Sequence, residues 1–182
     1  MLDLKLDYKE AKDTNSVAMP GVGGYVAKII SVEDHPQEKY LQLELDISEG
    51  EYKDCFTEAW KTWGNWPAMG STRVYYNTEK AIEYGFMPFI GAIQESNGGF
   101  GFNNDEKTLK GKTVGIIIGE REYLSRDGEV KVAKNINRFR SADAIREGRF
   151  RMPKLRELPE DQKPKSNPLD GFTEVDDSDL PF

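Results

Sequence analysis

Residues 40–47 read Tyr-Leu-Gln-Leu-Glu-Leu-Asp-Ile and alternate strictly between polar or aromatic and aliphatic side chains. Successive side chains of a β-strand point to opposite faces of its sheet, so a period of two predicts a strand with one face on a core. The leucines and the isoleucine occupy the predicted core face, and Tyr40 lies on the opposite, solvent-facing side. This stretch predicts an antiparallel, mainly β fold.

Similar patterns predict four more strands on either side of this stretch. In chain order, the five predicted strands span residues 22–32, 40–47, 52–60, 114–123 and 130–139. Short polar turns separate the first three strands, which predicts a meander. A turn containing Asp127 and Gly128 joins the last two, and this dipeptide is typical of tight hairpins.

Helices are predicted in two places. Thr78 is a suitable N-cap for a helix that continues to Asn97, and Pro88 inside it predicts a kink or a division into two short helices. Ser141 is predicted to cap a second, short helix that ends at Gly148. Three strands, a helix and two strands is the order of the OB-fold, a five-stranded Greek-key barrel with a helix between strands 3 and 4.

The predicted boundaries divide the 182 residues into three parts. Residues 1–19 are an N-terminal extension, residues 20–150 are the OB-fold domain, and residues 151–182 are an acidic tail. The prolines and charges beyond Pro153 predict disorder in that tail. No apolar run approaches the length that a bilayer span needs, so no membrane partner is expected.

The composition argues against an enzyme and against a bound metal or other cofactor. Cys55 is the only cysteine and His35 the only histidine, so the chain has no intrachain disulfide and no cysteine or two-histidine metal site. His35 precedes Pro36 and is predicted to lie in a surface turn. No phosphate loop and no Ser/His/Asp set with supporting context is present. A lone cysteine fits the reducing cytoplasm, which is the predicted location.

The net charge of −7 is unevenly distributed along the chain. Residues 131–156 hold nine basic and two acidic side chains, whereas residues 157–182 hold two basic and eight acidic ones. A basic segment next to an acidic tail predicts an anionic ligand, with the tail as an electrostatic competitor for the same surface.

Binding a single nucleic-acid strand requires cations that follow the phosphates and flat side chains on which bases stack. The chain interleaves both kinds of residue. Trp63 and Trp66 fall in a predicted loop, and strand parity directs Tyr40, Lys131 and Phe139 away from the aliphatic face. The predicted binding residues are Tyr40, Trp60, Trp63, Trp66, Arg73, Arg121, Arg126, Lys131, Lys134, Arg138 and Phe139.

The chain ends with an acidic cluster that continues into an apolar, proline-containing terminus. This predicted partner-binding tip consists of Asp176, Asp177, Asp179, Leu180, Pro181 and Phe182. A solubilising tail has no need to finish on an exposed phenylalanine. Phe182 therefore suits an apolar pocket on a partner, and the carboxylates suit its basic surroundings.

This terminus resembles the acidic tip of bacterial single-stranded DNA-binding proteins, which reads Asp-Asp-Asp-Ile-Pro-Phe, with Ser178 replacing one aspartate and Leu180 the isoleucine. Together with the strand order and the aromatic and basic residues, the chain resembles a bacteriophage-type single-stranded DNA-binding protein. The resemblance implies that it coats and protects single-stranded DNA during phage replication or recombination in the host cytoplasm, and recruits replication or recombination proteins through its tip. Cellular members have a long linker before the tip, whereas roughly 25 polar residues intervene here and shorten its reach.

Two other functions stay open on the sequence alone. One is an RNA-binding OB module, and the other is a protein–protein adaptor that binds no nucleic acid. The relative affinity for DNA and RNA separates the first, and the absence of salt-sensitive nucleic-acid binding would favour the second. The sequence is compatible with a homo-oligomer and does not fix its size.

Overall fold

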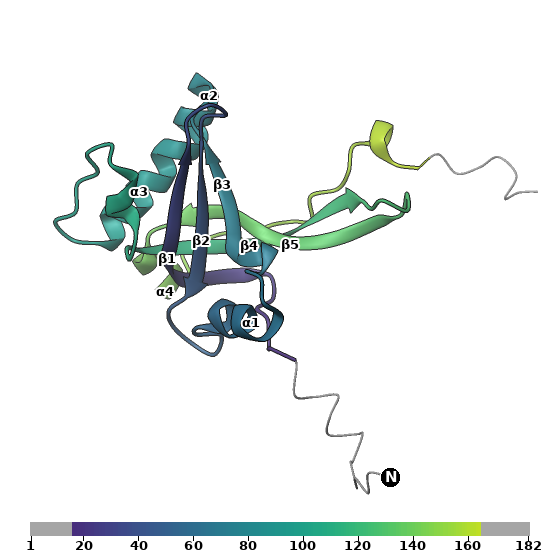
Figure 1. The fold of residues 1–182 in the computed structure, drawn as a ribbon, viewed down its shortest axis with the longest axis horizontal. Coiled ribbons are helices and arrows are strands. Elements are labelled where there is room, and N and C mark those ends of the chain that lie inside the picture. Colours follow the sequence, from purple (N-terminus) through teal and green to yellow (C-terminus); the bar gives the residue numbers. More distant parts are fainter. Residues whose placement is uncertain (1–15, 165–182) are drawn as a thin grey trace, which may run out of the picture.

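A computed structural model describes residues 16–164 of the chain, with one five-stranded antiparallel sheet at its centre (Figure 1). The strand order across the sheet is β3-β2-β1-β4-β5. The strands span Gly23–His35 (β1), Tyr40–Ile47 (β2), Ser71–Tyr75 (β3), Thr113–Leu124 (β4) and Val130–Arg140 (β5). Within the described residues no hydrogen-bonded pairing joins the two edge strands, so the sheet is open between β3 and β5.

Helical segments fill the connections between the strands. They are α1 (Cys55–Trp63), η2 (Ala68–Gly70), α2 (Glu79–Ala81), η3 (Ile82–Phe86), α3 (Met87–Ser96), η4 (Glu106–Leu109), α4 (Ala142–Arg146) and η5 (Glu160–Gln162). The segment η3 is a π-turn, and it separates α2 from α3. The predicted helix after Thr78 is thus confirmed, as is its division near Pro88.

The core lies on the face of the sheet that the alternation of residues 40–47 predicts. Leu43, Leu45 and Ile47 are fully buried there, together with Ile116 and Ile118 of β4. Helix α3 contacts β4 and β5 and adds buried apolar side chains to the same cluster. The prediction for β2 is confirmed in both bounds and facing of its aliphatic side chains.

The predicted third strand, residues 52–60, is wrong, because most of it belongs to helix α1. The carboxylate of Asp46 accepts hydrogen bonds from the backbone N–H groups of Phe56 (3.0 Å) and Thr57 (2.9 Å) in the first turn of this helix. Asp46 is buried, and such charge-assisted bonds contribute about 1.5–3 kcal/mol each. The group that stabilises the start of α1 therefore comes from β2, and the local sequence does not reveal it.

The third strand is instead β3, which follows the turn η2. It pairs with β2 from Tyr40 opposite Tyr75 to Glu44 opposite Ser71. Only Val74 of its five residues is buried. A short edge strand with one buried residue carries almost no periodic signal, which explains why the pattern of residues 71–75 predicts no strand.

A bulge in β5 reverses the facing of its last residues. Consecutive residues of β4 pair with Ile136 and Arg138, so Asn137 is the extra residue. Ile136 and Phe139 therefore face the core together, and the ring of Phe139 lies 4.7 Å from that of Phe89. The prediction that Phe139 points away from the aliphatic face is wrong for this reason.

Within the predicted tail the structure describes residues 154–164, of which Arg156 and Leu158 form hydrogen bonds with β4. The N–H of Arg156 donates to the carbonyl of Glu120, and the N–H of Glu122 donates to the carbonyl of Arg156, both at 2.9 Å. Strand β1 pairs with β4 only as far as Ile118, so the edge of β4 beyond it is available for these bonds. The predicted tip, residues 176–182, lies outside the described residues.

The hairpin and short-helix predictions agree with the structure. Residues 125–129 connect β4 to β5, with Gly128 at the positive φ of 79° that favours glycine. The hydroxyl of Ser141 accepts a hydrogen bond from the N–H of Ala144 at the start of α4. Figure 1 shows the distal part of this hairpin projecting from the body of the molecule.

Candidate nucleic-acid interface

Two adjoining hollows flank β5. The first, here the cationic hollow, has a volume of about 1070 Å³ and lies between β5 and residues 148–156, which we call the strap. The second, here the aromatic hollow, has a volume of about 610 Å³ and lies between β3, β5 and the helical residues 81–89. Asn137, Arg138 and Arg140 line both hollows, so the two are continuous across β5.

The strap is fastened to the sheet by Phe150. Its ring packs on a small second core on the outer face of the sheet, formed by Val26, Ile117, Ala142 and Ile145. Glycine at position 24 permits this approach, since a Cβ there would lie 2.5 Å from the Phe150 ring. The close packing fixes the backbone on either side of Phe150, which carries Arg149 and Arg151.

A second fastening point lies farther along the strap. Pro153 sits over Gly119 of β4, where an added Cβ would meet the proline ring at 3.1 Å. The backbone bonds of Arg156 to β4 follow three residues later. The strap is therefore attached at both ends, and its side chains are held at set positions over the sheet.

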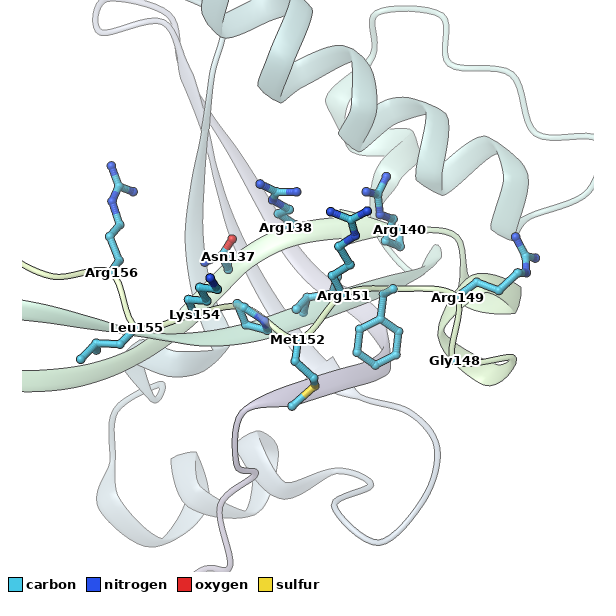
Figure 2. Close-up of a pocket in the computed structure, with 13 residues that line it drawn as sticks. Asn137, Arg138, Arg140, Gly148, Arg149, Arg151, Met152, Lys154, Leu155 and Arg156 are labelled. Atoms are coloured by element: carbon cyan, nitrogen blue, oxygen red, sulfur yellow. The ribbon is translucent and has the colours of Figure 1, made fainter.

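Basic side chains gather on one side of the strap. Its sequence alternates basic and apolar residues as far as Met152, and an extended chain directs alternate side chains to opposite sides. In Figure 2 the side chain of Arg151 points to the side on which Arg138 and Arg140 lie, whereas Met152 points the other way. Lys154 and Arg156 point with Arg151 in the same view.

Among the described residues, most of these cations have no acidic partner. Arg149 forms an ion pair with Glu147. Within residues 16–164 no salt bridge engages the other basic residues of the hollow, which are Arg138, Arg140, Arg151, Lys154 and Arg156. Like charges gathered around one hollow raise the local positive potential, which makes the cationic hollow electrostatically suited to a polyanion or to several anions.

The aromatic hollow combines rings with further cations. Tyr75 comes from β3, Tyr84 from η3 and Phe139 from β5. Arg73 lines it too; a hydrogen bond with Tyr75 raises the pKa of its guanidinium, which stays charged at any physiological pH. No acidic side chain among the described residues lines either hollow.

Three of the predicted binding residues, Arg73, Arg138 and Phe139, line these hollows. Four others lie on the hairpin and line neither one: Arg121, Arg126, Lys131 and Lys134. Lys131 is also paired there with Glu129 at 3.6 Å. The predicted set is therefore divided between the hollows and other parts of the surface.

The tryptophans lie apart from both hollows. Trp60 and Trp63 are on α1, with exposed fractions of 50% and 44%. Helix α1 and helix α2 lie at opposite ends of the molecule in Figure 1, and α2 borders the aromatic hollow. Trp66 is partly buried against the core and its indole N–H donates to the carbonyl of Gly70 at 3.1 Å, which makes it a structural residue rather than an exposed loop ring.

Tyr40 occupies the predicted face of β2 but is not open to solvent, so that part of its prediction is wrong. Its exposed fraction is 9%, because its neighbours cover the ring. His35 stacks on it with ring centroids 4.5 Å apart, and Tyr75 lies 5.3 Å away. The guanidinium carbon of Arg73 lies 4.8 Å from its centre. The Tyr40 ring thus packs against both Arg73 and Tyr75, two residues that line the aromatic hollow.

Several aromatic and basic residues that line the hollows are absent from the predicted set, and they include Tyr84 and the four strap cations Arg149, Arg151, Lys154 and Arg156. The regional charge count did identify the segment that contains the four cations. Nothing in the sequence distinguishes Tyr84 from the other aromatic residues, because its exposure depends on the turn that carries it.

No protein-family model matches the chain, and no curated protein matches its sequence. None of the helices described between residues 16 and 164 is long and apolar enough to cross a membrane. In the same residues no group of three histidine, cysteine, aspartate or glutamate side chains is arranged to hold a metal ion.

Proposed function

We propose that this protein binds single-stranded DNA along the cationic and aromatic hollows. The observation that carries the proposal is the row of arginine and lysine side chains between β5 and the strap, most of which form no salt bridge within residues 16–164, continuous with a hollow lined by aromatic rings. Cations that follow the phosphates, next to rings that can stack on bases, are the two materials that single-strand binding requires.

We further propose that the fold is an OB-type barrel that is open between β3 and β5. Three features support this assignment: the meander β1–β2–β3, the helix that follows β3, and the pairing of the β4–β5 hairpin with β1. OB-folds are partly open Greek-key barrels that bind oligonucleotides on their surface. The assignment rests on the order of the elements and not on closure of the sheet.

The cellular role that fits this activity is coating and protecting single-stranded DNA during phage replication or recombination in the host cytoplasm. The acidic tip would then recruit replication or recombination proteins. Support for the tip comes from its sequence, since residues 165–182 are not described. Deleting residues 176–182 should abolish capture of such enzymes while single-stranded DNA affinity stays equal or rises at low salt. Retention of every partner would make the tip a solubilising tail.

Fluorescence anisotropy with labelled oligo(dT) tests the DNA-binding proposal. It is preferable to tryptophan emission because Trp60 and Trp63 lie away from the hollows. The logarithm of the affinity should fall with the logarithm of salt by about 0.7 per phosphate neutralised. Preference for duplex DNA would contradict the proposal. Preference for RNA of equal length would favour the RNA-binding alternative, and absence of salt-sensitive binding would favour the adaptor.

A further inference from the structure

The ring of Tyr84 is unusually exposed for its place in the molecule. Its exposed fraction is 70%, yet it lines the aromatic hollow and belongs to a turn that packs beside β3. Tyr75, on the β3 side of the same hollow, is 41% exposed. Large apolar rings left open around a concavity point to a ligand that covers them.

The π-turn that presents Tyr84 has a local cause. Pro88 has no N–H, so the regular helical bond to the carbonyl of Tyr84, four residues earlier, cannot form. The chain widens into η3 just before this proline, and the N–H of Met87 bonds to the carbonyl of Ile82, five residues back. Wide turns of this kind occur frequently at functional sites.

Gly85, the residue after Tyr84, also lines the aromatic hollow. A Cβ built on Gly85 would meet no atom within 4 Å outside its chain neighbours and its own helix backbone, so this glycine is not required by packing against other parts of the protein. A larger residue there would occupy part of the space beside the Tyr84 ring. The volume of about 610 Å³ lies within the roughly 300–1,000 Å³ typical of small-ligand sites.

The rest of the hollow suits a flat, polar-edged ligand attached to a phosphate. Phe139 contributes rigid apolar surface, and the fully buried Phe89 packs behind its ring. The amide of Asn137 can donate and accept hydrogen bonds, and Arg138 and Arg140 continue directly into the cationic hollow. A nucleotide within a strand has this combination of ring, polar edge and neighbouring phosphates.

We propose that the aromatic hollow is a base-binding subsite, in which an unstacked nucleobase stacks on Tyr84 while the flanking phosphates lie in the cationic hollow. This inference rests on the proposed function and assigns base stacking to the aromatic hollow and phosphate binding to the cationic hollow. Duplex DNA is excluded from the subsite because its bases are already stacked and paired. Stacking on a side chain is tolerant of sequence because every base has a π-face.

The test compares two labelled strands of equal length, oligo(dT) and an abasic strand with the same number of phosphates. Wild-type protein should bind oligo(dT) more tightly. Tyr84→Ala should weaken oligo(dT) binding about 5- to 150-fold, the range for one stacked base, and leave the abasic strand nearly unaffected. Tyr84→Phe should retain the preference, and Gly85→Leu should lose it by filling the space beside the Tyr84 ring. Tyr123→Ala, an exposed ring on the hairpin outside both hollows, is the matched control.

Photocrosslinking supplies a second measurement that does not depend on variants. Oligo(dT) containing 5-iododeoxyuridine should crosslink to the peptide that carries Tyr84 or Tyr75. Equal binding of both strands by the wild type, equal loss for both strands in Tyr84→Ala, or crosslinks confined to α1 would overturn the subsite and leave DNA binding intact. Failure to bind either strand would instead reject the proposed function itself.

Discussion

The two hollows beside β5 share three residues but are built in different ways. The cationic hollow depends on a strap that folds back over the sheet, and positive charge dominates its lining. The aromatic hollow lies where β3 and β5 fail to pair, and rings contribute more of its lining. Attraction between charges acts over a distance and is screened by salt. Stacking requires direct contact and is not screened by salt. The two hollows should therefore respond differently to salt and to substitution.

The largest effect is expected at the residues that both hollows share. Arg138→Glu combined with Arg140→Glu should lower oligo(dT) affinity about 100-fold or more at low salt, because two attractive charges become repulsive. Both side chains are exposed, so the thermal midpoint should change little. Anisotropy titrations measure the loss. Lys131→Glu combined with Lys134→Glu makes the same charge change on the same strand outside both hollows. An equal loss in this control would show that only net charge matters.

The next largest effect concerns the attachment of the strap. In Gly24→Ala the new Cβ would lie 2.5 Å from the Phe150 ring, so the ring must move. Overpacking of this kind costs about 1–3 kcal/mol of unfolding free energy, and displaced strap cations should lower affinity about tenfold. Thermal unfolding and anisotropy report the two effects. Adding Phe150→Leu should recover part of both; unchanged affinity in Gly24→Ala would show that the strap does not position the DNA.

A smaller substitution separates charge from stacking. Arg151→Ala should reduce the salt slope of oligo(dT) binding by about 0.7, the value for one lost phosphate contact. Tyr84→Ala should leave that slope unchanged even where its affinity is lower. Titrations at several salt concentrations give both slopes. An equal fall of the salt slope in Arg151→Ala and Tyr84→Ala would contradict the proposal that phosphates bind in the cationic hollow and a base stacks in the aromatic hollow.

The smallest effect is expected on α1. Trp60→Ala and Trp63→Ala should each change oligo(dT) affinity by less than about twofold, because a stacking contribution of 1–3 kcal/mol requires contact with a base and neither residue lines a hollow. The same titration measures both variants. A loss of tenfold or more in either one would extend the DNA path to α1 and restore the prediction made from the sequence.

Periodicity was informative where one side of an element faces the core. The alternation of residues 40–47 gave the bounds of β2, and the Asp127-Gly128 turn gave the β4–β5 hairpin. Periodicity gave the wrong element for residues 52–60, because the carboxylate that stabilises α1 belongs to Asp46 on another element. It also failed at Phe139, because one inserted residue, Asn137, reverses the facing of everything after it.

The charge of the candidate site is predictable from the sequence, whereas of its rings the predicted set includes Phe139 but neither Tyr75 nor Tyr84. The excess of basic residues between 131 and 156 is visible in the sequence and marks both β5 and the strap. The sequence does not reveal which of these cations form ion pairs. Arg146, for example, pairs with Glu49, which is far away along the chain. Residue type alone favours tryptophan as a stacking ring, whereas exposure beside the cations favours Tyr84.

The strand order has a consequence for how the protein refolds. The pairs β1–β2 and β4–β5 are local hairpins, but β1 must also pair with β4, which is distant in sequence. Such non-local pairing carries a larger loop-closure entropy and is expected to form late. Strands β3 and β5 lie at opposite edges of the sheet, so the hollow between them exists only after the two halves have joined. Recovery of oligo(dT) binding after dilution from denaturant would therefore time the final assembly of the sheet, later than the return of β-sheet circular dichroism.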